Sequence, residues 1–150
     1  MTTTIENLKI LFNRDLNKLK LEIESYHDES IIWNIEKSIS NSAGNLCLHL
    51  IGNLNAFIGT QLGKTGYIRN RELEFSDKNV SKNLLIEQIE ATLLMINNTL
   101  NQLNDDDLKV EYPIVVFESK MSTEFFLIHL TTHLAYHLGQ INYHRRLLDN

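Results

Sequence analysis

The sequence predicts an all-α protein, a bundle of four long helices with a short extended segment before the last one. Apolar residues recur at three- and four-residue spacing over most of the chain, which is the pattern of amphipathic helices. The 150 residues include one proline and six glycines, few enough for long uninterrupted helices. Four helical stretches joined by loops, two of them long, predict an up-down-up-down bundle or a variant with crossover connections.

The first helix is expected over residues 3–25, where leucines, isoleucines and a phenylalanine keep helical spacing among lysines and glutamates. Asn41 and Ser42 form a good N-cap for a second helix that runs to about Leu62. This helix is apolar almost all round, so we expect it to be buried on most sides. A cluster of glycines, Gly59–Gly66, ends it, and a loop over residues 67–75 mixes charged and aromatic residues and can overhang a site.

A third helix is expected from Asn79 or Ser81 to about Leu103, and the acidic turn at 104–107 ends it. Residues 108–121 break the helical pattern with a proline among β-branched and aromatic residues, which predicts an extended segment, a short hairpin or a strand. Ser122 then caps the last helix, with Glu124 in its first turn, where negative charge is favoured.

Composition predicts one soluble domain over residues 1–150, since a chain of this length can bury a continuous core. A formal net charge of −5 argues against a nucleic-acid partner. Cys47 is the single cysteine, so neither an intrachain disulfide nor a cysteine-rich zinc site is expected. The first residues do not resemble a signal peptide, and no apolar run approaches the ~20 residues that span a bilayer. A cytoplasmic protein without a membrane partner is the default expectation.

The last helix carries His129, His133 and His137, spaced four residues apart so that their side chains share one face. On a helical wheel they fall within about 80° of one another, beside the apolar seam. Glu124, Thr131, Asn142 and Asp149 fall roughly opposite them. We therefore expect the imidazoles to point inward, where they need hydrogen-bond partners, protons or a metal.

The apolar second helix carries a polar stripe, Asn45, His49 and Asn53, again at four-residue spacing. One interpretation is a hydrogen-bond ladder inside the core, which is the commoner role of a single histidine on an apolar helix. The other is that His49 meets the histidine stripe of the last helix. The choice between them depends on how the two helices pack.

Two histidines at i and i+4 can hold one metal ion from a single helix face, and His133 with His137 has this spacing. His49 is the strongest candidate for a third ligand, and three protein ligands leave an open coordination position for water or substrate. The glutamate of the H-E-x-x-H motif is absent, so a zincin protease is excluded. His129 is a candidate second-shell group, substrate contact or core histidine. His27 and His144 lie near helix ends, outside this site.

These motifs resemble the DinB/YfiT-like superfamily over nearly the whole chain. The similarity rests on the segment Asn45-Leu-Cys-Leu-His49-Leu-Ile-Gly-Asn53 and on the later pattern His133-x-x-x-His137-x-Gly139-Gln140-Ile141. The glycine-rich loop with Arg69-Asn70-Arg71-Glu72 resembles a branch of this superfamily whose function is unknown. The resemblance implies a four-helix bundle, frequent homodimers and a divalent metal, commonly zinc or nickel, on residues matching His49, His133 and His137.

The same resemblance implies a reaction class, because characterised relatives are transferases and isomerases that use low-molecular-weight thiols. The leading hypothesis is therefore a metal-dependent thiol S-transferase acting on a small electrophile. The alternatives are a metal-dependent hydrolase and a non-catalytic dimeric stress-response or binding module. Gln140 matches the family pattern and is expected to support the site, as are Asn45, Asn53 and His129. Arg69 or Arg71 is a candidate for holding an anionic group of the cofactor or substrate, or is structurally paired instead. No catalytic base is assigned.

Overall fold

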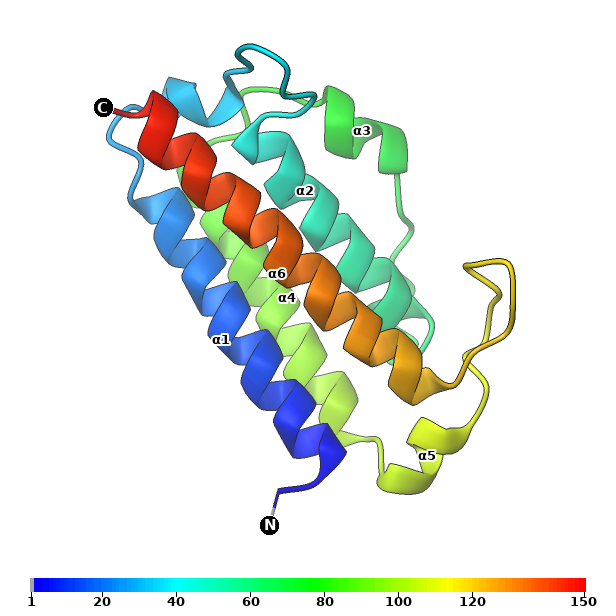
Figure 1. Cartoon of the computed structure of the whole chain (residues 1–150). Coiled ribbons are helices and arrows are strands. Elements are labelled where there is room, and N and C mark those ends of the chain that lie inside the picture. Colours follow the sequence, from blue (N-terminus) through cyan, green and yellow to red (C-terminus); the bar gives the residue numbers. More distant parts are fainter. Residues whose placement is uncertain (1) are drawn as a thin grey trace.

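The computed structural model describes residues 2–150 and is a bundle of four long helices, as the sequence predicts (Figure 1). These helices are α1 (Thr4–Glu24), α2 (Ala43–Leu54), α4 (Lys82–Asn101) and α6 (Thr123–Leu148). Four shorter elements connect them: the 3₁₀ helix η1 (Glu29–Trp33), the π-helical segment η2 (Asn55–Thr60), α3 (Arg71–Ser76) and α5 (Asp105–Lys109).

The four long helices form a square. Helix α1 packs against α4 and α6, and α2, at the opposite corner, packs against the same two helices. In Figure 1 α2 and α4 run in the same direction, because the segment between them returns along the side of the bundle before α4 begins. The bundle is thus the variant with a crossover. This connection matters for function because it carries α3, which packs against α2.

Each long helix begins where the sequence provides a capping side chain. Thr3 caps α1 with a capping box, in which its hydroxyl accepts from the Glu6 N–H and the Glu6 carboxylate accepts from the Thr3 N–H. Ser42, Ser81 and Ser122 each accept a hydrogen bond from the N–H three residues later. Removing such a cap typically costs ~1 kcal/mol of stability, so these residues define the helix starts.

One hydrophobic core joins all four long helices. Its fully buried side chains include Phe12, Leu16, Leu19 and Ile23 of α1, Leu50 and Leu54 of α2, Leu85, Ile89, Ile96 and Leu100 of α4, and Phe126, Leu127, Leu130 and Ile141 of α6. Full burial of a large aliphatic or aromatic side chain is worth roughly 1.5–3 kcal/mol, so this core is the main stabilising contribution.

The second helix departs from the prediction at its end. Its α-helical part stops at Leu54, and η2 continues the same rod with wider turns. The backbone bonds from the Gln61 N–H to the Ala56 carbonyl and from the Gly63 N–H to the Ile58 carbonyl span five residues, which is the π-helical spacing. A side-chain bond from Asn55 Nδ2 to the Ile51 carbonyl, at 2.8 Å, lies where the helical ladder changes.

Two short helices occur where loops or turns were expected. Asn70 caps α3 within the loop at 67–75, and Asn104 forms a capping box with Asp107 that begins α5 in the acidic turn. Residues 108 and 109 belong to α5. Residues 110–121 are irregular, and the described chain has no strand there beyond a single bridge between Glu111 and Ser122. That bridge anchors the start of α6.

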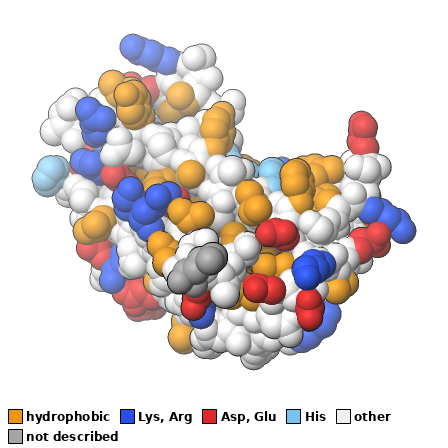
Figure 2. All heavy atoms as spheres, turned by 60° about the horizontal axis from the view of Figure 1, so that its bottom comes forward, with side chains coloured by type: hydrophobic (Ala, Val, Ile, Leu, Met, Phe, Trp, Pro, Cys, Tyr) orange, Lys and Arg blue, Asp and Glu red, His pale blue; other side chains and the backbone are white. Residues whose placement is uncertain are grey.

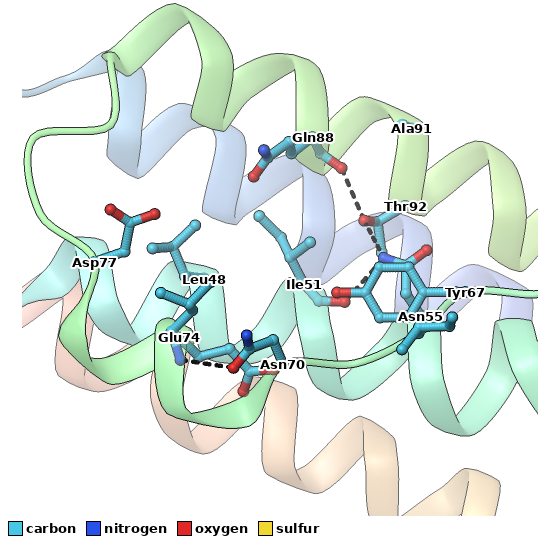
Figure 3. A pocket seen from close by; sticks show the side chains of 12 residues that line it. Leu48, Ile51, Asn55, Tyr67, Asn70, Glu74, Asp77, Gln88, Ala91 and Thr92 are labelled. Atoms are coloured by element: carbon cyan, nitrogen blue, oxygen red, sulfur yellow. Dashed lines mark hydrogen bonds between the residues drawn. The ribbon is translucent and has the colours of Figure 1, made fainter.

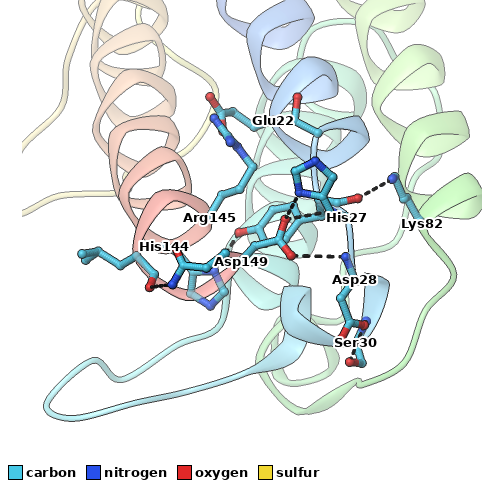
Figure 4. Close-up of polar contacts among 12 residues, drawn as sticks. Glu22, His27, Asp28, Ser30, Lys82, His144, Arg145 and Asp149 are labelled. Atoms are coloured by element: carbon cyan, nitrogen blue, oxygen red, sulfur yellow. Dashed lines mark hydrogen bonds and ion pairs between the residues drawn. The ribbon is translucent and has the colours of Figure 1, made fainter.

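Polar contacts fasten the end of α6 to the end of α1 (Figure 4). The Asp149 carboxylate accepts from the backbone N–H groups of His27 and Asp28, and Arg145 donates to Glu22 at 2.7 Å. These contacts hold α6 in a fixed register against the bundle. Within residues 2–150, every helix is too short or too polar to cross a membrane.

Candidate metal centre

Three imidazole rings meet where α2 packs against α6. His49 projects from the middle of α2, and His133 and His137 project from consecutive turns of α6. One ring nitrogen from each residue can be chosen so that all three lie within 4.8 Å of one another. The Nε2 atoms of His49 and His133 are 3.3 Å apart. Of the two interpretations of His49, the structure therefore has the one in which His49 meets the histidine stripe of the last helix.

Helix packing explains why these residues meet. The two helices run antiparallel in Figure 1, so positions further along α2 face positions earlier in α6. The edge-to-face contact of Phe57 with Phe126, at 5.1 Å between ring centroids, follows this rule two turns below His49. The spacing that stacks histidines on one face of each helix therefore brings the two polar stripes to the same interface.

The histidines of α6 lie at the border between core and solvent, beside the apolar seam, as the helical wheel predicts. His133 and His137 are half-buried, and the outward face of α6 carries Phe125, Ile128, Tyr136, Tyr143 and Leu147. The polar positions opposite the histidines face α1 instead, since Asn142 Nδ2 donates to Glu22 at 2.7 Å. A periodicity argument finds the apolar seam but not which neighbouring helix covers each flank.

The outer nitrogen of His49 is bound by a carboxylate from α3. His49 Nδ1 lies 3.0 Å from Glu74 Oε1, and a carboxylate only accepts, so the ring donates its Nδ1 proton. The lone pair of His49 is then on Nε2, facing His133. A carboxylate behind a histidine in this way is the usual outer partner of a metal-binding imidazole.

Glu74 is itself tightly held. Arg69 donates to both carboxylate oxygens, with Nε 2.8 Å from Oε2 and Nη2 2.9 Å from Oε1. Burial alone raises the pKa of Glu74, but the hydrogen bonds from His49 and Arg69 outweigh burial and keep the pKa below its usual value. The carboxylate is therefore ionised at neutral pH.

Gly52 lets this carboxylate approach α2. A Cβ at residue 52 would be 1.9 Å from Glu74 Oε2, which no side chain can occupy. Asn45, one turn before His49, donates through Nδ2 to the backbone carbonyls of Glu74 and Asp77, at 2.9 and 2.8 Å. The predicted supporting residue Asn45 thus reaches the main chain of α3 and not the imidazoles.

The outer nitrogens of the other two ligand candidates differ in their partners. His137 Nδ1 lies 2.8 Å from Gln140 Oε1, which accepts its proton and leaves the Nε2 lone pair free. His133 Nδ1 is buried and has no hydrogen-bond partner among the described residues. Asn53 Oδ1, on the polar stripe of α2, is buried and unpartnered in the same way.

The surroundings favour neutral imidazoles. Burial, together with the neighbouring His137 and His49, lowers the pKa of His133 to about 4. Burial also lowers the pKa of His137, although the Gln140 contact opposes this shift. Neutral rings keep a lone pair for a metal, so the cluster suits a divalent cation at neutral pH without prior loss of protons to solvent.

The two arginines are engaged with the protein. Arg69 pairs with Glu74, and its guanidinium also lies 5.6 Å from the centroid of Phe57. Arg71 lies over Phe75, 5.3 Å from the ring centroid. The sequence left open whether Arg69 holds an anionic ligand or is structurally paired. In the structure it is paired with Glu74.

His129 extends the stripe on α6 toward aromatic residues. Its ring stacks on Phe126, meets Phe117 edge-on at 4.9 Å, and lies 6.2 Å from the ring centre of His133. His129 therefore borders the cluster without being one of its three closely placed rings. His27 and His144 lie at the far end of α6, where His144 bonds to Tyr26 and to the Asn34 carbonyl (Figure 4).

A cleft of about 790 Å³ opens beside the cluster. His137 and Gln140 line it together with Tyr136 and Tyr143, and the loop at residues 36–41 forms its opposite wall. Its volume is in the range of small-molecule sites. Figure 2 also shows histidine side chains at the surface in a hollow flanked by hydrophobic side chains. Because His137 lines the cleft of about 790 Å³, the imidazole cluster is accessible from outside.

A second cleft of about 410 Å³ lies between α2, α3 and α4 (Figure 3). Its walls include Glu74, Asn70 and Thr92 but none of the three clustered histidines. In Figure 3 α6 lies on the other side of α2 from this cleft. A ligand of the imidazoles would therefore enter from the α6 side.

Glu74 is the site residue that sequence reasoning missed, because residues 67–75 were expected to be a loop. A signal was present in Gly52, since a glycine inside a buried helix costs about 1 kcal/mol relative to alanine and marks a close approach. The sequence does not say which residue makes that approach.

Comparison with known proteins places this architecture in a family. The family model described as "Protein of unknown function (DUF1572)" matches residues 2–150. The crystal structure of a DinB-like protein from Bacillus cereus ATCC 10987 is similar, with a TM-score of 0.70 and 16% identity over 90% of this chain and 86% of that chain. At this identity the similarity concerns the fold. No curated protein matches the chain. The protein therefore belongs to the DUF1572 family and has the DinB-like helical fold that its histidine motifs predict.

Proposed function

We propose that this protein is a metal-dependent enzyme that binds one divalent ion, zinc or nickel, through His49, His133 and His137. The observation that carries the proposal is the closeness of the three ring nitrogens, within 4.8 Å of one another. Two of the rings already have acceptors, Glu74 and Gln140, on their outer nitrogens. Three protein ligands leave a coordination position for a further group, which is the pattern of catalytic metal sites.

The reaction proposed is transfer of a low-molecular-weight thiol to a small electrophile. A bound metal stabilises a thiolate and so supplies the nucleophile. The carboxylate that contacts the cluster, Glu74, has both oxygens engaged by Arg69 and His49, so it is poorly placed to take a proton. A thiol, with a pKa near ~8.5, gives up its proton without a strong base, but so does a metal-bound water, whose pKa is near ~7. The thiol is therefore proposed on the resemblance of the histidine motifs to those of thiol-dependent relatives.

The cleft beside His137 is the proposed approach for thiol and electrophile. Tyr136, Tyr143 and Leu46 give it an apolar and aromatic lining, and the Gln140 amide adds a polar contact close to the cluster. Because Arg69 is paired with Glu74, an anionic group of the substrate would be held from this cleft, where Lys37 is the basic residue of the lining.

Elemental analysis of untagged protein tests the metal site. We expect about one zinc or nickel ion per chain in the wild type and in a His27→Ala control, whose substituted side chain is exposed and outside the cluster. The double variant His49→Ala/His133→Ala should keep its helical content and lose the ion. A wild-type protein that cannot be loaded with either metal would remove the basis of the proposal.

Turnover assays separate the reaction classes. Stimulation by a thiol, with loss of the free thiol group, supports transfer, whereas thiol-independent turnover supports metal-dependent hydrolysis by bound hydroxide. The non-catalytic alternative is a binding or stress-response module, in which the histidines only form hydrogen bonds. It predicts neither bound metal nor sensitivity to chelators.

A homodimer is the proposed assembly. What supports it is the outward face of α6, where Phe125 and Ile128 are exposed near its start and Tyr136, Tyr143 and Leu147 further along. The last three also line the cleft, so a partner on this face would border the cleft. Contiguous apolar surface of this kind is typical of protein contacts. Light scattering during size-exclusion chromatography would give the molar mass, and a mass of one chain over the micromolar range would contradict the dimer.

A further inference from the structure

The three imidazoles of the cluster are not equally supplied with hydrogen-bond partners. Glu74 accepts from His49, and Gln140 accepts from His137. His133 has no such acceptor, and its Nδ1 atom is buried without a partner. A buried polar atom without a partner is uncommon in native proteins and calls for an explanation.

The hydrogen bonds assign the position of the proton on each ring. His49 donates Nδ1–H to Glu74, so its Nε2 atom can only accept. The 3.3 Å contact between the Nε2 atoms of His49 and His133 is then a bond in which His133 donates. The neutral His133 ring therefore has its proton on Nε2 and a lone pair on the buried Nδ1 atom.

Asn53 has the other unpartnered atom at this interface. It lies on α2 between His49 and Phe57, four residues from each, and these two residues contact His133 and Phe126 of α6 respectively. The facing stretch of α6 lies between those two contacts. By this register Asn53 faces the stretch of α6 around His129 and Leu130, one turn from His133. Helical side chains lean toward the N-terminus of their own helix, so in this antiparallel pair the side chains of Asn53 and His133 lean toward each other. Asn53 is 7% exposed, and its Oδ1 atom accepts no hydrogen bond.

We propose that Asn53 Oδ1 accepts the Nδ1 proton of His133, directly or through one water molecule, when His133 binds the metal through Nε2. This inference rests on the proposed metal site. A neutral imidazole that gives its Nε2 lone pair to a metal carries its proton on Nδ1. The buried nitrogen then changes from acceptor to donor. Without metal, Asn53 Oδ1 and His133 Nδ1 are both acceptors and cannot form a hydrogen bond with each other. With metal, His133 Nδ1 is a donor and Asn53 Oδ1 is its acceptor.

Asn53 is thus a positioning residue that selects the metal-binding tautomer of His133. With Glu74 and Gln140 it completes a set in which each ligand has its own acceptor. Losing an outer partner of a metal ligand typically weakens metal binding by about 10- to 100-fold.

Zinc binding by three variants tests this role. Asn53→Leu removes the acceptor at similar volume, Asn53→Asp keeps an acceptor oxygen, and Asn55→Leu is the matched control, since Asn55 bonds to Thr92 of α4. Competition with a chromogenic chelator gives each zinc affinity. We expect a loss of about 10- to 100-fold for Asn53→Leu, about wild-type affinity for Asn55→Leu, and wild-type or tighter affinity for Asn53→Asp, whose carboxylate adds a negative charge behind the ring.

Nuclear magnetic resonance of zinc-loaded protein labelled with ¹⁵N-histidine gives a second readout, which does not depend on the stability of the variant. The Nδ1 proton of His133 should be observed, protected from exchange, in the wild type and in Asn55→Leu, and lost in Asn53→Leu. Should the leucine variant fail to fold, the aspartate variant still reports, through a downfield shift of this proton.

An Asn53→Leu protein with unchanged zinc affinity and an intact His133 Nδ1 proton signal would overturn the role of Asn53 while leaving the metal site in place. A His133 ring with its proton on Nε2 in the zinc-loaded protein would also overturn it. A wild-type protein that binds no zinc would instead overturn the metal site itself. The two failures are therefore distinguishable.

Discussion

His49 donates a hydrogen bond to Glu74 across 3.0 Å, and this contact joins the buried helix α2 to the short helix α3 of the crossover connection. Arg69, from the same connection, holds both oxygens of that carboxylate. The crossover between α2 and α4 therefore contributes directly to the orientation and charge of a proposed metal ligand.

Glu74→Gln should weaken zinc binding by about 10- to 100-fold, because the amide still accepts from His49 but removes the negative charge that makes the ring a better donor to a metal. The amide nitrogen also meets Arg69 unfavourably. Glu72→Gln is the control, since Glu72 is exposed on the same helix and should behave as wild type. Competition with a chelator measures the zinc affinity of both variants. Equal zinc affinities of Glu74→Gln and Glu72→Gln would contradict the role of Glu74.

Gly52→Ala should destabilise the protein, because the new Cβ would collide with the Glu74 carboxylate that is bound to Arg69 and His49. Forced overpacking of this kind costs ~1–3 kcal/mol. Gly139→Ala is the matched control on α6, where nothing lies within 4 Å of the added methyl group. There we expect a gain of up to ~1 kcal/mol from helix propensity. Urea denaturation gives the free energy of unfolding of both variants. A Gly52→Ala variant with the wild-type free energy of unfolding would show that α3 can shift to make room for the methyl group.

Stability should fall as the pH is lowered below about 6.5, the ordinary pKa of histidine, partly because of His144. Burial lowers the pKa of His144, although the Asn34 carbonyl and the charge of Glu36 oppose this. The unfolded chain then binds a proton at a higher pH than the native protein, so acid favours unfolding.

Melting temperatures between pH 7.5 and pH 5 test this prediction. The melting temperature should change less steeply with pH in His144→Gln than in the wild type. Comparing the two slopes separates His144 from His133 and His137, whose pKa values are also lowered. Identical slopes would show that His144 protonates equally in both states.

Cys47 should be unreactive in the native protein. Its side chain is fully buried, and burial raises the pKa of the thiol to about 12. We expect a disulfide reagent at pH 8 to modify it at least ~100-fold more slowly than in denaturant, because the thiolate is the reactive form. The thiol in the proposed transfer would then come from a small molecule. Rapid native modification would make Cys47 itself a candidate nucleophile.

Much of the fold follows from local patterns. The caps Ser42 and Ser122 and the apolar spacing predict where long helices begin, because these features depend on neighbours within one or two turns. The short helices α3 and α5 were missed because helices of five or six residues bury too little surface to leave a periodic signal. The π-helical end of α2 was missed because it depends on hydrogen bonds that a hydrophobic pattern does not contain.

The 3.6-residue period is enough to predict that His133 and His137 share one helix face and that His49 lies on a polar stripe of a buried helix. The packing of the helices is needed to find that the two stripes meet, that Glu74 lies behind His49, and that the buried atoms His133 Nδ1 and Asn53 Oδ1 have no partner among the described residues. These relations join residues 25 to 84 positions apart in the chain. They depend on helix direction, register and the path of the crossover, which no local pattern encodes.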